Sequence, residues 1–213
     1  MAADETMIAA LAEAEVSGFL HRPARADGRG LVLTHGAGGN CRAPLLSAAA
    51  AAFAAAGITV LRCDLAFRRK RSRGPPHRAA AAADRAGLGA ALHYMRRLVA
   101  GPVWLGGHSY GGRQASMLVA EAPTIAAGLL LLSYPLHPPG QPERMRTAHF
   151  PDLHRPAIFV HGDADPFGAI GALRDAIAAI PAPTRLIALP GAGHDLRRGR
   201  IDFAPMLAAL AAL

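Results

Sequence analysis

The sequence contains few cysteines and few aromatic residues. Among 213 residues there are two cysteines, Cys41 and Cys63, and aromatic side chains make up 5%. These cysteines have neither the number nor the spacing of a disulfide framework or a zinc site, so we expect free thiols, buried or half-buried. Hydrophobic residues make up 52%. That share is enough for one domain with a substantial, mainly aliphatic core.

Lysine is nearly missing. Lys70 is the only lysine, and the formal net charge of +8 comes from arginine. A basic chain raises the question of nucleic-acid binding. The arginines are scattered, however, apart from one dense run at residues 68–73. Arginine in place of lysine, together with abundant alanine, indicates a compositional bias, so we expect no nucleic-acid partner.

Long apolar runs and a targeting segment are also missing. The most apolar stretches, residues 45–61 and 122–132, are short for a bilayer span, and Gly57 interrupts the first. Residues 1–15 carry acids and lack the basic and apolar regions of a signal peptide. We therefore expect a cytoplasmic protein with no membrane partner, and the oligomeric state stays open.

Short apolar runs alternate with helical patterns along the chain. We expect strands at residues 31–34, 58–62, 103–105, 128–132, 157–160 and 185–189. Runs that are apolar on both faces are typical of a buried parallel sheet. An initial strand near residues 16–21 would add an edge.

Between these runs, apolar residues recur at helical spacing. The stripes are Leu88, Leu92, Met95 and Val99; Ile170, Leu173, Ile177 and Ile180; and Phe203, Met206 or Leu207, and Leu210. Alternating strands and helices predict an α/β fold, with a mainly parallel sheet, helices on both faces and no cap domain. There is no internal repeat and no long linker, so residues 1–213 form one predicted domain.

Two proline-containing segments, residues 67–78 and 134–144, follow predicted strands. Proline should keep both irregular. We expect both at the carboxyl edge of the sheet, where ligands bind in open α/β folds. The arginine run in the first segment could attract an anionic substrate, but the sequence favours a solvated basic loop.

The residues Gly107-His108-Ser109-Tyr110-Gly111 have the form Gly-x-Ser-x-Gly, between a predicted strand and a helix that starts near Gly111. Glycines at these positions allow a sharp strand-to-helix turn that exposes the serine, and the helix N-terminus adds positive charge beside it. The alternative is a glycine-rich turn with an incidental serine. The motif predicts that Ser109 is a nucleophile.

A glycine-rich loop, His35-Gly36-Ala37-Gly38-Gly39, ends the first long strand. An oxyanion hole needs one N–H from such a loop and one from the residue after the nucleophile, so Ala37 and Tyr110 are the predicted donors. A phosphate cradle is the alternative, but the lysine and spacing of a P-loop are missing.

An acid and a base follow two later strands. Asp163 and Asp165 lie after residues 157–160, and His194 lies after residues 185–189. One histidine among ten proves little, but the chain order Ser109, Asp165, His194 is the order of an α/β-hydrolase triad. Asp165 has more reach than Asp163, and Pro166 restricts its backbone. Asp163 is then expected to be a turn residue.

The chain resembles the α/β-hydrolase superfamily over essentially its whole length, and more closely a group of small bacterial hydrolases related to dienelactone hydrolases. The matching segments are Thr34-His-Gly-Ala-Gly-Gly39, Gly106-Gly-His-Ser-Tyr-Gly-Gly-Arg113, Ser133-Tyr-Pro-Leu-His-Pro-Pro-Gly140 and Gly162-Asp-Ala-Asp-Pro-Phe-Gly168. The resemblance also places the acid at the fourth position of Gly-x-x-Asp, which is Asp165. Dienelactone hydrolases proper use cysteine where this chain has Ser109, so the resemblance implies no lactone specificity.

These features predict a serine hydrolase that cleaves an ester or thioester of a small-molecule acyl substrate, without metal or cofactor. Candidate substrate-binding residues are Arg113, one turn into the helix after Ser109, and Tyr134 and His137 in the second proline-containing segment. The alternative is a scaffold or binding protein that keeps the fold but has lost catalysis.

Overall fold

A computed structural model gives the structure of the chain and describes residues 6–13, 15–196 and 201–213. The strands, in chain order, are β1 (Met7–Ala12), β2 (Ser17–Arg22), β3 (Gly30–Thr34), β4 (Thr59–Cys63), β5 (Val103–His108), β6 (Leu129–Leu132), β7 (Ala157–Gly162) and β8 (Thr184–Leu189). The α-helices are α1 (Pro44–Ala55), α2 (Ala66–Lys70), α3 (Ala81–Arg96), α4 (Tyr110–Glu121), α5 (Ile170–Ile177) and α6 (Ala204–Ala212). Short 3-10 turns are η1 (Arg78–Ala80), η2 (Pro123–Ile125) and η3 (Phe150–Asp152).

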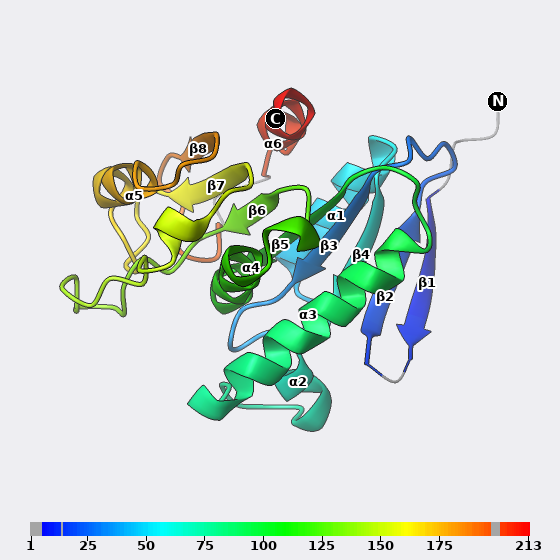
Figure 1. Cartoon of the computed structure of the whole chain (residues 1–213), viewed down its shortest axis with the longest axis horizontal. Helices are drawn as coiled ribbons and strands as arrows, with labels where there is room; N and C mark the ends of the chain where they lie inside the picture. The colour runs from blue at the N-terminus through cyan, green and yellow to red at the C-terminus, as the bar shows by residue number, and fades with distance from the viewer. Residues whose placement is uncertain (1–5, 14, 197–200) are drawn as a thin grey trace.

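The strands form one eight-stranded sheet in the order β1-β2-β4-β3-β5-β6-β7-β8 (Figure 1). Strands β3 to β8 run parallel, whereas β1 and β2 pair antiparallel at one side. This mainly parallel sheet with helices on both faces confirms the predicted fold class. Strand β1 was not predicted, because its residues, including Met7 and Ile8, are largely exposed and carry no alternating pattern.

Alternate side chains of the central strands enter two different cores. In β3, Val32 packs in the layer formed with α3, α4 and α5, whereas Leu31 and Leu33 pack in the layer formed with α1 and α6. Figure 1 shows α3 and α4 in front of the sheet and α1 behind it. Because both faces of these strands are buried, their sequences are apolar throughout, as the predicted parallel sheet requires.

The first proline-containing segment is partly helical, which corrects the expectation that residues 67–78 are irregular throughout. Helix α2 covers residues 67–70, because the first proline of the segment, Pro75, comes five residues after its end. The second segment, residues 134–144, contains no helix or strand. Helices α3 and α5 end before the last residues of the predicted stripes, Val99 and Ile180.

The loops that follow β3, β5, β7 and β8 emerge at the carboxyl edge of the parallel strands, as expected for a ligand site. No cap domain covers this edge in the part of the chain that the structure describes. Across residues 6–13, 15–196 and 201–213, no helix has the length and apolar character needed to span a bilayer.

Candidate active site

Ser109 lies on a sharp turn between β5 and α4. Its backbone has φ 51° and ψ −118°, in a region that residues other than glycine rarely adopt. The flanking glycines permit the turn. A Cβ atom on Gly107 would lie 2.8 Å from backbone atoms of Gly111 and Gly112, and one on Gly111 would lie 2.4 Å from the His35 carbonyl oxygen. The turn therefore depends on the lack of side chains at Gly107 and Gly111.

The structure brings Ser109, His194 and Asp165 together. The Oγ of Ser109 lies 2.7 Å from Nε2 of His194. On the other side of the ring, Nδ1 of His194 lies 2.8 Å and 3.0 Å from the two carboxylate oxygens of Asp165. Because a carboxylate only accepts, Nδ1–H donates to Asp165, and Nε2 is left to accept the serine proton.

Asp165 and Asp163 occupy different positions. The side chain of Asp165 is fully buried, and its Oδ1 also accepts the Phe167 N–H at 2.8 Å. Asp163 is exposed and accepts the Gly191 N–H at 2.5 Å, so it links the two loops that carry Asp165 and His194. The geometry thus assigns the contact with the histidine to Asp165.

Two rings that the sequence analysis did not single out hold the imidazole of His194. Phe167 stacks on it with a centroid separation of 4.0 Å and an interplanar angle of 26°. His108 lies 5.2 Å away, centroid to centroid, and its Nε2–H donates to the His194 carbonyl oxygen at 2.8 Å. Burial lowers the pKa of His108, which favours the neutral ring. Both residues lie inside motifs that the sequence shows: His108 is the variable residue before Ser109 in Gly-x-Ser-x-Gly, and Phe167 follows Asp165-Pro166.

Arg68, which is 7% exposed, holds the glycine-rich loop after β3 in place. Its guanidinium donates to the carbonyl oxygens of Gly39 at 2.7 Å and of Ala37 at 3.0 Å. It also donates to the carbonyl oxygens of Arg71 and Gly74, in the segment that follows α2. Arg68 is therefore a buried connection between two loops. The expectation that the arginine run is a solvated loop is wrong for Arg68, because its buried guanidinium donates hydrogen bonds to backbone carbonyl oxygens.

His35, which begins the glycine-rich loop, connects it to the segment between β4 and α2. Its ring is buried, with Nδ1 2.8 Å from the Gly36 carbonyl oxygen, and Nε2 accepts the Leu65 N–H at 3.1 Å. This arrangement uses a neutral ring, and burial lowers the pKa of His35 accordingly. Ala37 and Tyr110, the predicted N–H donors, both line the same cavity as Ser109.

Two cavities meet at Ser109. The smaller, about 360 Å³, is mostly apolar and lies between the glycine-rich loop, the start of α1, and the rings of His108, Phe167 and His194. We call it the histidine-side pocket. The larger, about 800 Å³, extends the other way, over the start of α4 and between the two proline-containing segments. We call it the arginine-side pocket.

Of the candidate substrate-binding residues, only Arg113 lines either pocket. It lies in the wall of the arginine-side pocket, whereas Tyr134 is fully buried and its hydroxyl donates to the Arg146 carbonyl oxygen at 2.6 Å. His137 has its Nδ1 2.7 Å from the Pro138 carbonyl oxygen and lies outside both linings. The structure gives Tyr134 a packing role in place of the expected contact with substrate.

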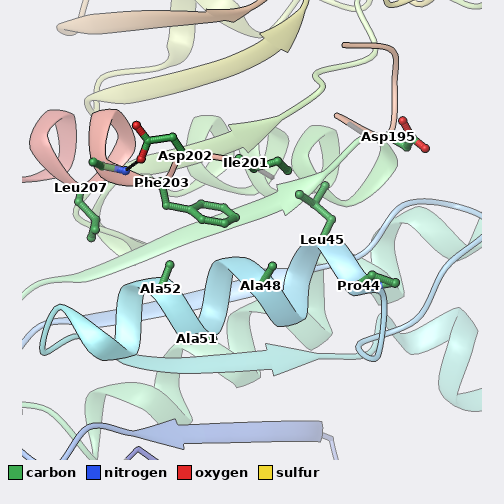
Figure 2. Close-up of a pocket in the computed structure, with 11 residues that line it drawn as sticks. Pro44, Leu45, Ala48, Ala51, Ala52, Asp195, Ile201, Asp202, Phe203 and Leu207 are labelled. Atoms are coloured by element: carbon green, nitrogen blue, oxygen red, sulfur yellow. Dashed lines mark hydrogen bonds between the residues drawn. The ribbon is translucent and has the colours of Figure 1, made fainter. Parts of the chain in front are cut away.

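An apolar groove of about 890 Å³ lies between α1 and α6 (Figure 2). Figure 2 shows Leu45, Ala48 and Ala52 on one wall, with Phe203 and Leu207 facing them from the C-terminal segment. The groove shares Pro44, Leu45 and Asp195 with the histidine-side pocket. The groove and the histidine-side pocket are therefore adjacent.

The two cysteines are free and buried, as expected. Burial raises the pKa of both thiols to about 12. At neutral pH they are therefore protonated and poor nucleophiles. Neither thiol offers a competing nucleophile to Ser109.

Comparison with known proteins agrees with the fold. A family model described as an alpha/beta hydrolase domain matches residues 27–204. The fold is similar to that of a dienelactone hydrolase from Anabaena variabilis, with a TM-score of 0.70, 20% identity, and coverage of 98% of this chain and 94% of the other. It is also similar to XC6422 from Xanthomonas campestris, described as an α/β serine hydrolase without lid, with a TM-score of 0.67, 19% identity, and coverage of 98% and 93%. A serine hydrolase homologue from Coxiella burnetii has a TM-score of 0.68 at 17% identity, with coverage of 98% and 94%.

Proposed function

The chain belongs to the α/β-hydrolase family, and from that premise we propose that it is a serine hydrolase that cleaves an ester or thioester through an acyl-enzyme. One observation carries the proposal. Ser109 Oγ lies 2.7 Å from His194 Nε2, and His194 Nδ1 lies 2.8 Å from Asp165, with the serine on a turn at positive φ. A nucleophile, a base in contact with it, and an acid that orients the base are the parts that acyl transfer requires.

In the proposed first step, His194 takes the hydroxyl proton as Ser109 Oγ attacks the carbonyl carbon. Asp165 keeps the proton on Nδ1 and stabilises the imidazolium that forms. His194 then gives the proton to the leaving oxygen or sulfur, and the acyl group stays on Ser109. Water, activated by His194, releases the acid and restores the serine.

The negative charge of the tetrahedral intermediate would lie against the N–H groups of Ala37 and Tyr110. Tyr110 is the first residue of α4, so the positive end of the helix dipole also faces this charge. A single donor of this kind typically lowers the barrier by about 3 kcal/mol. The phenol of Tyr110 points elsewhere, since its hydroxyl donates to Asp84 at 2.8 Å, and only its backbone is assigned a part in the chemistry.

The test is hydrolysis of p-nitrophenyl butyrate by the wild type and two serine variants. Ser109→Ala should lose the activity, since it removes the hydroxyl that contacts His194 Nε2. Ser72→Ala is the matched control, because Ser72 is an exposed serine outside both pockets, and it should retain wild-type rates. Hydrolysis by folded Ser109→Ala at the wild-type rate would overturn the assignment. A folded wild type that turns over no ester would instead favour a non-catalytic scaffold.

A further inference from the structure

In the part of the chain that the structure describes, the arginine-side pocket is lined by several positively charged side chains and no negatively charged ones. Arg78, Arg113, Arg144 and Arg146 line it, and no aspartate or glutamate is among its described lining residues. These arginines come from three separate places, η1, α4 and the segment before β7. Within the residues that the structure describes, none of the four forms an ion pair with a carboxylate. The described lining of this pocket therefore carries positive charge and no carboxylate, and the buried Asp84, which accepts the Tyr110 hydroxyl, is not part of the lining.

The charges in this wall act on one another. Burial lowers the pKa of Arg146, and the positive charge of Arg113 lowers it further, with Arg144 adding to the effect. Arginine stays protonated even so. Like charges held together in a partly buried wall cost free energy, and an anion bound between them would offset that cost.

Two hydrogen-bond donors in the wall lack an acceptor. The Nε of Arg113 is buried and has no partner among the described residues. Gln114 is 0% exposed, and its Oε1 accepts from Arg85 at 3.1 Å, which leaves its buried Nε2 amide without a partner in the described structure. Buried donors are normally satisfied, so donors left over in a pocket wall indicate a missing acceptor. A carboxylate offers two acceptor oxygens in the geometry that a guanidinium fork matches.

The position of His194 decides which half of the substrate enters this pocket. His194 must protonate the leaving oxygen, so the leaving group lies on its side of Ser109. His194 lines the apolar histidine-side pocket but not the arginine-side pocket. Tyr110, whose N–H would face the oxyanion, lines the arginine-side pocket and not the histidine-side pocket, whereas Ala37 and Ser109 line both. The acyl chain therefore extends into the positively charged cavity.

We propose that the substrate is a half-ester of a dicarboxylic acid, whose acyl chain ends in a carboxylate held by Arg113 and its neighbours, and whose leaving group is apolar. This inference rests on the proposed serine-hydrolase function and adds the substrate class to it. Attack by Ser109 releases the apolar alcohol along the histidine-side pocket. Water then cleaves the acyl-enzyme and yields the free dicarboxylate, with no other co-reactant.

The experiment compares three esters that differ in where the charge lies. In p-nitrophenyl hemiadipate and p-nitrophenyl hexanoate the acyl chains differ only by carboxylate against methyl, and 4-(hexanoyloxy)benzoate carries the charge in the leaving group. We expect kcat/KM for the hemiadipate to exceed that for the hexanoate by about tenfold or more, as charge-assisted hydrogen bonds allow. Background hydrolysis is taken from Ser109→Ala.

Variants separate binding of the anion from the chemistry. Arg113→Met should lower kcat/KM for the hemiadipate by about tenfold and change that for the hexanoate by less than about threefold. Arg144→Gln, at an exposed position, should also lower kcat/KM for the hemiadipate. Arg174→Gln removes an exposed arginine of α5 outside the pocket and should leave both esters unchanged.

Equal kcat/KM for hemiadipate and hexanoate, with both dependent on Ser109, would overturn this inference and leave the hydrolase proposal standing. A preference for 4-(hexanoyloxy)benzoate that Arg113→Met removes would overturn the placement of the acyl group. Failure of the folded wild type to turn over any of the three esters would overturn both proposals.

Discussion

The guanidinium of Arg68 donates a hydrogen bond to the carbonyl oxygen of Ala37, the residue whose N–H is proposed to receive the oxyanion. The same side chain holds Gly39 and Gly74, so it fixes the glycine-rich loop against the segment after α2. A donor in an oxyanion hole is effective only when it is already aimed at the developing charge. Arg68 is therefore a positioning residue for that loop.

Replacing Arg68 should impair the reaction more than binding of the substrate. We expect Arg68→Met to lower kcat for p-nitrophenyl butyrate by about tenfold to a hundredfold with a smaller change in KM, because a misplaced donor weakens stabilisation of the transition state. Arg68→Lys should recover part of the loss, since one ammonium can still reach some of the carbonyl oxygens. Lys70→Gln, an exposed change on the same helix, is the control. A loss confined to KM would contradict this role.

The two aspartates after β7 should differ sharply. Asp165→Asn should lower kcat on the order of 10⁴-fold, because an amide no longer fixes the tautomer of His194. Asp163→Asn removes only the acceptor for the Gly191 N–H and should cost far less. The measurement is kcat for both variants on one ester, with circular dichroism to verify folding. The reverse ranking would contradict the assignment of Asp165 and leave the family membership unaffected.

Phe167 should restrain the imidazole of His194. We expect Phe167→Ala to lower kcat several-fold, on the order of tenfold, because the ring it exposes can turn away from Ser109. Phe167→Tyr keeps the stacked face and should retain most of the activity. The rates of the two variants on p-nitrophenyl butyrate test the point. Equal rates for the alanine and tyrosine variants would show that stacking has no part in catalysis.

Acid should destabilise the fold through His21. Arg62 Nε donates to His21 Nε2 at 2.9 Å, which requires a neutral ring, and burial first and the Arg62 charge second lower the pKa of His21 to about 4. Since the unfolded chain binds this proton near pH 6.5, stability is present above that pH and is lost as the pH falls towards 4, by an amount of the order of 3 kcal/mol.

The measurement is the free energy of unfolding by urea between pH 7 and 4. His21→Gln keeps an acceptor for Arg62 without a titrating group, so its unfolding free energy should fall less steeply over this range. Parallel curves for wild type and variant would show that His21 does not carry the dependence.

The sequence predicts Ser109, Asp165 and His194 because each follows an apolar run that forms a strand and carries a local motif. The three residues lie close together because parallel strands end at the same edge of the sheet. Arg68 could not be assigned in this way, since its partner Ala37 is 31 residues away and only the packing of two loops brings them together. From the sequence alone, a run of arginines predicts a solvated segment, and nothing in the run distinguishes the one arginine that is buried.

Three other features could not be predicted from the sequence, for similar reasons. Strand β1 has no buried face to create a pattern, and Tyr134 is buried by aromatic contacts with Phe150 and Phe159 that no local motif encodes. The unbalanced wall of the arginine-side pocket combines residues from η1, α4 and the segment before β7. Its charge appears only when the fold brings these elements together.

The most direct test of the central claim is reaction of the folded protein with a fluorophosphonate, which phosphonylates activated serines. Intact mass and peptide mapping should find a single adduct on Ser109, missing from Ser109→Ala and formed far more slowly in His194→Asn, because the serine is activated by its contact with His194. No adduct on folded wild-type protein, or an adduct on a different serine, would contradict the account.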